Sequence, residues 1–252
     1  MGCTMTMPSH MSSQPSLTEE PDAWPLHAAR ATAIGVDYGY SHDHTAIVSL
    51  AEFAQSGRLV HVSHIIKQFP LQTPPDLVRA KLAKIASSIA TARHRPQIVV
   101  DSRSNSAFFH AVVQMGFSPA VVGVSATGSE HHAQRPEVQL VPTNGGQGRV
   151  AAAVWSISRN QAVEAVGAAL NDRSLVILDQ GDANTLKAEM SGLRRVITTA
   201  RNIRYEPPAG GHDDLLMGLA YALFALRHLP RRQKLRKPPR RGRAMTNSAG
   251  WT

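Results

Sequence analysis

The chain of 252 residues contains a single cysteine, Cys3, and only 5% aromatic residues. One cysteine cannot form an internal disulfide, which excludes a small disulfide-stabilised scaffold and favours a reducing compartment. The sequence has no run of about 18 apolar residues, so no membrane span is expected. Its first 25 residues also lack the apolar core of a secretory signal, so we expect a cytoplasmic protein.

Acidic residues are missing from the stretch between Arg227 and Arg243, which holds nine Lys or Arg residues. Elsewhere 18 basic residues face 18 acidic ones, so the whole formal excess of +9 lies in this stretch. Its prolines prevent a regular helix, and residues 230–252 are predicted to form a flexible basic tail. Such a tail suits contact with a nucleic-acid backbone, and a merely solubilising tail is the alternative.

The rest of the composition is that of a globular domain, with 42% hydrophobic and 18% charged residues. Residues 1–30 show no apolar periodicity and are predicted to be disordered. Residues 31–229 are predicted to form one α/β domain.

Apolar patterns along this domain alternate between strand and helix. Three strands with short links predict an antiparallel meander, and a helix, a strand, a helix and a strand follow. A polar segment at 128–148 reads as a loop or small hairpin. The predicted strands are 32–39, 44–53, 57–69, 96–101, 120–127, 174–179 and the exposed 198–207, and the predicted helices are 74–93, 105–116, 149–170, 184–197 and 212–229. This order favours a mixed sheet with helices on both faces.

Aspartates stand at the ends of three of these elements. Asp37 ends the first strand, Asp101 ends the fourth, and Asp213 and Asp214 open the final helix. Each has a simple structural explanation, because aspartate shapes turns and caps helices. If the first and fourth strands are neighbours, however, their carboxylates emerge at one edge of the sheet beside that helix.

Carboxylates gathered in this way repel one another unless cations offset their charge. Mg²⁺ and Mn²⁺ suit sites made of oxygen ligands. Two such ions about 4 Å apart can activate a water and stabilise the leaving oxygen of a phosphodiester. The sequence therefore predicts a site of two Mg²⁺ or Mn²⁺ ions.

Three segments resemble a known family in their order and spacing: GVDYGYSHDHTAIV, IVVDSRSNSAFFHAVVQMGF and GGHDDLLMGLAYALFAL. Together they are similar to the nuclease domain of the large terminase subunit of tailed bacteriophages. The resemblance covers residues 34–229. It implies a ribonuclease-H-like fold with a mixed five-stranded sheet, and an endonuclease that cuts concatemeric viral DNA during packaging in the bacterial host cytoplasm.

The resemblance also implies roles for individual residues. Asp37 would bridge the two metal ions, Asp101 would hold one of them, and Asp213 or Asp214 would supply the third ligand. Asp43 would be an auxiliary acid, and His212 would support the ligands. Asp37, Asp101 and Asp213 are thus the predicted catalytic residues.

One departure from the family concerns its motor. Packaging terminases carry an ATPase, but this sequence has no GxxxxGK[ST] loop, and TNGGQGR at 143–149 lacks the required Lys. A separate ATPase chain is therefore the expected partner, together with double-stranded DNA, the small terminase and the portal protein.

Other functions stay open at this point. One is a Holliday-junction-resolvase-like nuclease of the same broad fold, and a more distant one is an actin-like sugar kinase, for which the chain is short. A catalytically silent DNA-binding subunit is the alternative from a different class.

Overall fold

The computed structural model of the chain describes residues 24–90, 95–103, 105–117, 121–128, 132, 135–143, 148–197 and 203–230. The predicted basic tail beyond Pro230 lies outside these residues, and so do the first 23 residues. The domain begins earlier than the predicted boundary at residue 31. Trp24 is buried, and its ring packs 5.1 Å from that of Phe53.

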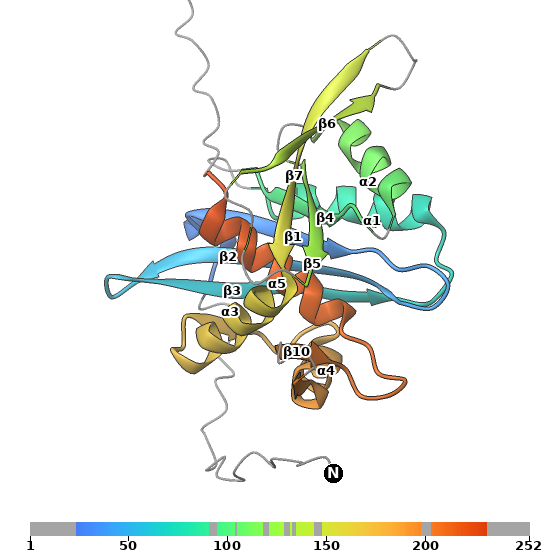
Figure 1. The fold of residues 1–252 in the computed structure, drawn as a ribbon. Coiled ribbons are helices and arrows are strands. Elements are labelled where there is room, and N and C mark those ends of the chain that lie inside the picture. Colours follow the sequence, from blue (N-terminus) through green and yellow to red (C-terminus); the bar gives the residue numbers. More distant parts are fainter. Residues whose placement is uncertain are drawn as a thin grey trace, which may run out of the picture.

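A large mixed sheet forms the centre of the molecule (Figure 1). Within the described residues it has eight strands in the order β6-β7-β5-β4-β1-β2-β3-β8. The prediction of five strands was therefore wrong, although the mixed α/β class is confirmed. The strands are β1 (Ala31–Asp37), β2 (Thr45–Gln55), β3 (Arg58–Phe69), β4 (Gln97–Asp101), β5 (Val121–Thr127), β6 (Glu137–Pro142), β7 (Arg149–Ser158) and β8 (Leu175–Ile177).

Strand directions follow the lengths of the connections. β1, β2 and β3 are joined by short turns and pair antiparallel, as the predicted meander requires. β1, β4, β5 and β7 run parallel, and helices or longer segments connect them. β6 pairs antiparallel with β7 at one edge, so the segment before residue 149 does form a hairpin.

The long helix predicted for residues 149–170 was wrong in its first half. Residues 149–158 form strand β7, and the helix α3 (Arg159–Asn171) starts only afterwards. An alanine-rich sequence favours a helix locally, but here the segment pairs with β5 on one side and with β6 on the other. Ser158 marks the change, because its side chain accepts a hydrogen bond from the Gln161 N–H and caps α3.

Helices cover both faces of the sheet, as predicted. Residues that alternate along β1 and β4 face opposite sides: Ile34, Val36, Ile98 and Val100 join one core, whereas Ala33 and Val99 join the other. The first core contains α1 (Pro75–Ser88) and α2 (Ser106–Val112), and the second contains α3, α4 (Ala183–Gly192) and α5 (Asp214–His228). A separate two-stranded sheet joins β9 (Arg194–Ile197) to β10 (Ile203–Glu206).

Helix α5 lies almost in backbone contact with β1. A Cβ on Gly35 would stand 1.9 Å from the carbonyl oxygen of Gly218 and 2.7 Å from the nitrogen of Ala222. The two glycines thus allow a close approach that a larger residue at position 35 would block. This contact fixes the start of α5 beside the carboxyl end of β1.

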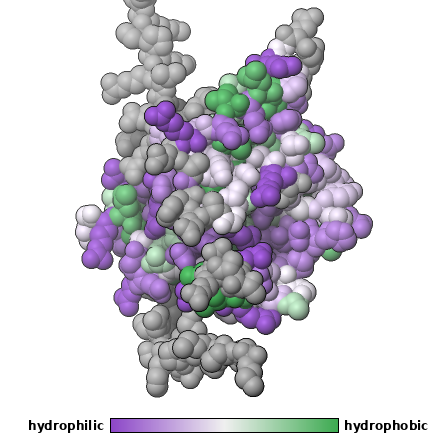
Figure 2. Space-filling view, in the orientation of Figure 1, coloured by the Kyte–Doolittle hydropathy of each residue, from purple (hydrophilic) through white to green (hydrophobic). Residues whose placement is uncertain are grey.

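The face of the molecule in Figure 2 is mostly hydrophilic, with small hydrophobic patches. Among the described residues, no helix is both long and apolar enough to span a membrane.

Candidate active site

Asp37 and Asp101 meet because β1 and β4 are parallel neighbours. The register pairs Val36 with Val100, so the next residue of each strand is an aspartate. Both carboxylates therefore leave the sheet at the same edge, as expected from the sequence. Asp101 is buried and also accepts a hydrogen bond from the backbone N–H of Arg103 at 2.8 Å.

Asp213 and Asp214 lie at the N-terminal end of α5: Asp213 precedes the helix, and Asp214 is its first residue. Asp214 is buried and accepts a 3.1 Å hydrogen bond from the backbone N–H of His44. The Nδ1 atom of His212 stands 3.8 Å from Oδ2 of Asp214. The side chain of Asp213 forms an ion pair with Arg159.

The turn between β1 and β2 supplies the fifth acid, Asp43. This turn is tight: a Cβ on Gly39 would stand 2.2 Å from the carbonyl oxygen of Asp43. Thr45 ties it down further, because its hydroxyl donates to the carbonyl of Gly39 at 2.6 Å. Asp43 is consequently held at the rim of the site, with its side chain exposed.

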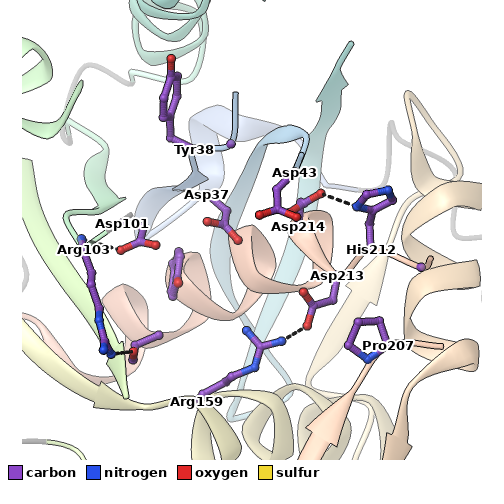
Figure 3. Close-up of a pocket in the computed structure, with 14 residues that line it drawn as sticks. Asp37, Tyr38, Asp43, Asp101, Arg103, Arg159, Pro207, His212, Asp213 and Asp214 are labelled. Atoms are coloured by element: carbon purple, nitrogen blue, oxygen red, sulfur yellow. Dashed lines mark hydrogen bonds and ion pairs between the residues drawn. The ribbon is translucent and has the colours of Figure 1, made fainter. Parts of the chain in front are cut away.

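These five acids line one pocket of about 280 Å³. Figure 3 shows Asp37 pointing into it between Asp101 and the pair Asp43 and Asp214, with Asp213 toward Arg159. The sequence-predicted residues Asp37, Asp43, Asp101, His212, Asp213 and Asp214 all belong to the lining, which also includes Tyr38, Gly39, Arg103, Ala126, Arg159, Pro207, Gly211 and Tyr221.

Gathering these carboxylates perturbs their protonation. Burial raises the pKa of Asp37 well above its usual value, and the neighbouring Asp101 and Asp214 raise it further. Burial also raises the pKa of Asp214 to about 6, although its bond from His44 lowers it. The pocket therefore favours a bound cation or a bound proton over bare negative charge.

Within the described part of the chain, no three His, Cys, Asp or Glu side chains are already placed to hold a metal ion together. Hydrogen bonds and an ion pair hold three of the acids: Asp101 with Arg103, Asp214 with His44, and Asp213 with Arg159. The donor set is nevertheless made of carboxylate oxygens, which suits Mg²⁺ or Mn²⁺ after rotation of these side chains.

Sequence reasoning missed three residues near the acids. Arg159 was placed inside a helix, whereas it is the first residue of α3 and faces the pocket. Tyr221 was assigned no role, but its buried ring lines the pocket two turns along α5 from Asp214. The signal for Arg159 was present, because Ser158 and Gln161 form the S-x-x-Q pattern of a helix start.

The third missed residue, Glu189 of α4, lies behind the site. Its Oε2 atom accepts a 2.9 Å hydrogen bond from the N–H of Leu216, in the first turn of α5. Its Oε1 atom has no hydrogen-bond partner among the residues that the structure describes. Burial raises the pKa of Glu189 to about 7, and repulsion by Asp214 and Asp213 adds to the shift. Glu189 thus holds the N-terminus of the helix that carries both aspartates.

Solved structures of low sequence identity share this fold. The large terminase nuclease from thermophilic phage G20c superposes with a TM-score of 0.50 and 14% identity, over 76% of this chain and 80% of that one. The same nuclease with bound cobalt also has a TM-score of 0.50 and 14% identity, over 76% and 79% of the two chains. The fold is that of a terminase nuclease domain.

No protein-family model matches the sequence, and neither does any curated protein. The terminase nuclease fold is thus recognised through its three-dimensional arrangement, not through overall sequence identity. The mixed α/β class predicted from the order of strands and helices is confirmed, and the likeness to terminase nuclease domains predicted from the three short segments is confirmed at the level of the fold. The roles of the individual aspartates stay predictions that rest on the geometry of the pocket.

Proposed function

We propose that the protein is a metal-dependent DNA endonuclease of the terminase type. The observation that carries this proposal is one pocket, lined by five aspartates from two strand ends, a turn and a helix start, in a terminase nuclease fold. A cobalt-bound structure of similar fold supports a divalent cation as the cofactor. Two Mg²⁺ or Mn²⁺ ions are proposed, since five carboxylates supply more charge than one ion offsets.

Asp37 is the proposed shared ligand, because it points into the centre of the pocket between the other acids. Asp101 would hold one ion, and Asp213 or Asp214 the other. Bound divalent cations supply an activated water and stabilise charge at the scissile phosphate. Asp43 at the rim adds negative charge, and His212 orients Asp214 across their 3.8 Å separation.

The remaining side chains prepare the pocket for this chemistry. Arg103 and Arg159 bring positive charge to a site that otherwise repels a phosphodiester. Tyr221, buried in α5, also lines the pocket beside the aspartates. With no base-reading module in the sequence, cleavage should be nearly independent of sequence.

Cleavage of supercoiled plasmid tests the proposal. The native chain should cut with Mg²⁺ or Mn²⁺ and stop cutting with EDTA. Asp37→Asn should lower the rate by about 100-fold or more, because it removes a shared ligand while keeping the shape of the side chain. Asp76→Asn is the matched control, since Asp76 is an exposed acid on α1, outside the pocket.

The other outcomes distinguish the alternatives. Equal, metal-independent cutting by the native chain and Asp37→Asn would point to a contaminating nuclease and contradict the assignment. Preference for a four-way junction over linear DNA would identify a resolvase-like enzyme. DNA binding without cleavage under every metal condition would identify a silent binding subunit.

Double-stranded DNA is the proposed substrate, and the proposed setting is a viral packaging machine in the host cytoplasm. An ATPase motor, the small terminase and the portal protein are the proposed partners.

A further inference from the structure

The acidic pocket already contains a cation of the protein's own, the guanidinium of Arg159. It pairs with the carboxylate of Asp213, whose side chain is only 14% exposed, while the Arg159 side chain is 34% exposed. Arg159 therefore reaches from the pocket wall to one of the proposed metal ligands, and its side chain remains partly exposed to solvent.

The backbone of Arg159 is held in place, whereas its guanidinium can move by rotation of the side chain. The backbone is held by the Ser158 cap of α3 and by Asn160, whose side chain donates to the carbonyl of Ile203 in β10. The guanidinium, in contrast, forms its ion pair with Asp213. Rotation about the side-chain torsions of Arg159 can therefore move this charge without disturbing α3.

The charge of Arg159 affects other acids of the pocket besides Asp213. Arg159 lines the same pocket as Asp37, Asp101 and Asp214, so its positive charge favours the ionised forms of these acids as well. A divalent cation entering beside Asp213 must overcome repulsion from this guanidinium, because both are positive.

We propose that Arg159 couples DNA binding to metal binding by exchanging partners. Without DNA, Arg159 neutralises Asp213 and weakens the binding of divalent cations. A DNA phosphate then takes over the guanidinium, which forms strong paired hydrogen bonds with phosphate oxygens, and Asp213 becomes free for a metal ion. This inference rests on the proposed nuclease function, and it makes the complete metal site depend on the presence of substrate.

Such coupling is reciprocal. If DNA raises the affinity for metal through Arg159, metal raises the affinity for DNA by the same factor, which for coupled sites is about 5- to 150-fold. The exchange would also limit cleavage chemistry to pockets that hold DNA. It also accounts for the ion pair between Asp213 and Arg159.

Calorimetric titration with Mn²⁺ tests the exchange, without and with a short phosphorothioate duplex that retains the backbone charge and resists hydrolysis. Titration of the duplex alone corrects for ions that bind to DNA directly. For the native chain, the duplex should raise the Mn²⁺ affinity at least about 5-fold. For Arg159→Gln, the affinity without DNA should already be at least about 5-fold above that of the native chain, and the duplex should change it little.

Two further variants keep the test sharp. Arg159→Lys retains the charge and should stay close to the native Mn²⁺ affinity without DNA, which also guards against a folding defect in Arg159→Gln. Arg103→Gln removes an equal charge from the same pocket, but Arg103 donates through its guanidinium to the carbonyl of Ala126. A general field effect would raise Mn²⁺ affinity equally in Arg103→Gln and Arg159→Gln, and that result would overturn the exchange.

The result also separates this inference from the proposed function. Native Mn²⁺ binding that Arg159→Gln leaves unchanged, with and without duplex, would overturn the exchange and leave the nuclease proposal standing. Absence of Mn²⁺ binding in the native chain and in every variant would overturn both.

Discussion

Asp37 and Glu189 show that individual residues of this domain are placed at a cost to stability. Burial raises the pKa of each carboxyl group, and nearby aspartates raise it further. Sites that carry out chemistry commonly concentrate such perturbed groups. Glu189 is the more informative of the two for folding, because it lies outside the pocket lining and bonds the backbone of α5.

Substitution of Glu189 should separate its hydrogen bond from its charge. At pH 8, Glu189→Gln keeps an acceptor for the Leu216 N–H and removes a charge that Asp213 and Asp214 repel, so the free energy of unfolding should stay equal or rise by about 1 kcal/mol. Glu189→Ala leaves the Leu216 N–H unpaired and opens a cavity, so the free energy of unfolding should fall by about 2–3 kcal/mol. Urea unfolding measures both.

The control for this pair is Glu164→Gln. Glu164 is an exposed acid of α3 that accepts from the Tyr205 hydroxyl, and its change should stay within about 0.5 kcal/mol. A loss of 2 kcal/mol or more in Glu189→Gln would show that the negative charge itself stabilises α5, contrary to this account.

At the scale of elements, the close packing of α5 on β1 places the aspartates together. Gly35→Ala should therefore destabilise the domain by about 3 kcal/mol, because its Cβ would collide with the backbone of Gly218 and push the helix away. The same substitution at Gly167, in α3, meets no atom of the described residues within 4 Å and should stabilise the domain by about 0.5–1 kcal/mol through helix propensity. Thermal unfolding compares the two, and equal effects would contradict the packing argument.

The strands and helices also show how much of the fold could be predicted from the sequence. Strand ends and helix starts made Asp37, Asp101, Asp213 and Asp214 predictable, because these boundaries have strong local signals. β7 was missed, since alanines favour a helix locally and only pairing with β5 and β6 makes the segment a strand. Arg159 was missed with it, because its approach to Asp213 depends on where β7 ends.

At the scale of the whole molecule, the raised pKa values link stability to pH and metal. The folded chain binds more protons than the unfolded chain at Asp37, Asp214 and Glu189, so these groups lower the stability as pH rises from about 4 through 7. Metal binding requires the deprotonated acids, so its stabilising effect grows over the same range.

Thermal unfolding at pH 5 and pH 8, each with EDTA or saturating Mg²⁺, tests this linkage. With Mg²⁺ at 100 times its dissociation constant at pH 8, the midpoint should rise by about 5–10 °C relative to EDTA. At pH 5 the rise should be much smaller. A larger rise at pH 5 than at pH 8 would contradict the assignment of these carboxyl groups to the metal site.

Removal of residues 231–252 tests the predicted basic tail. The cut belongs after Pro230, whose carbonyl accepts a 2.7 Å hydrogen bond from the Gln97 side chain. The shortened chain loses eight Lys or Arg residues. Its DNA affinity should fall, and its salt dependence should flatten by about 0.9 in log–log slope for each lost phosphate contact. An unchanged slope would mean that the tail does not contact DNA.

The central claim is that divalent cations bind among the aspartates at the edge of the sheet. Anomalous diffraction from crystals soaked in Mn²⁺ tests it most directly, because it locates the ions independently of activity. The account predicts two peaks in the pocket, one of them between Asp37 and Asp101 and the other between Asp37 and the start of α5, both weakened in Asp37→Asn. A pocket without a peak in crystals of the native chain, at saturating Mn²⁺ and neutral pH, would contradict it.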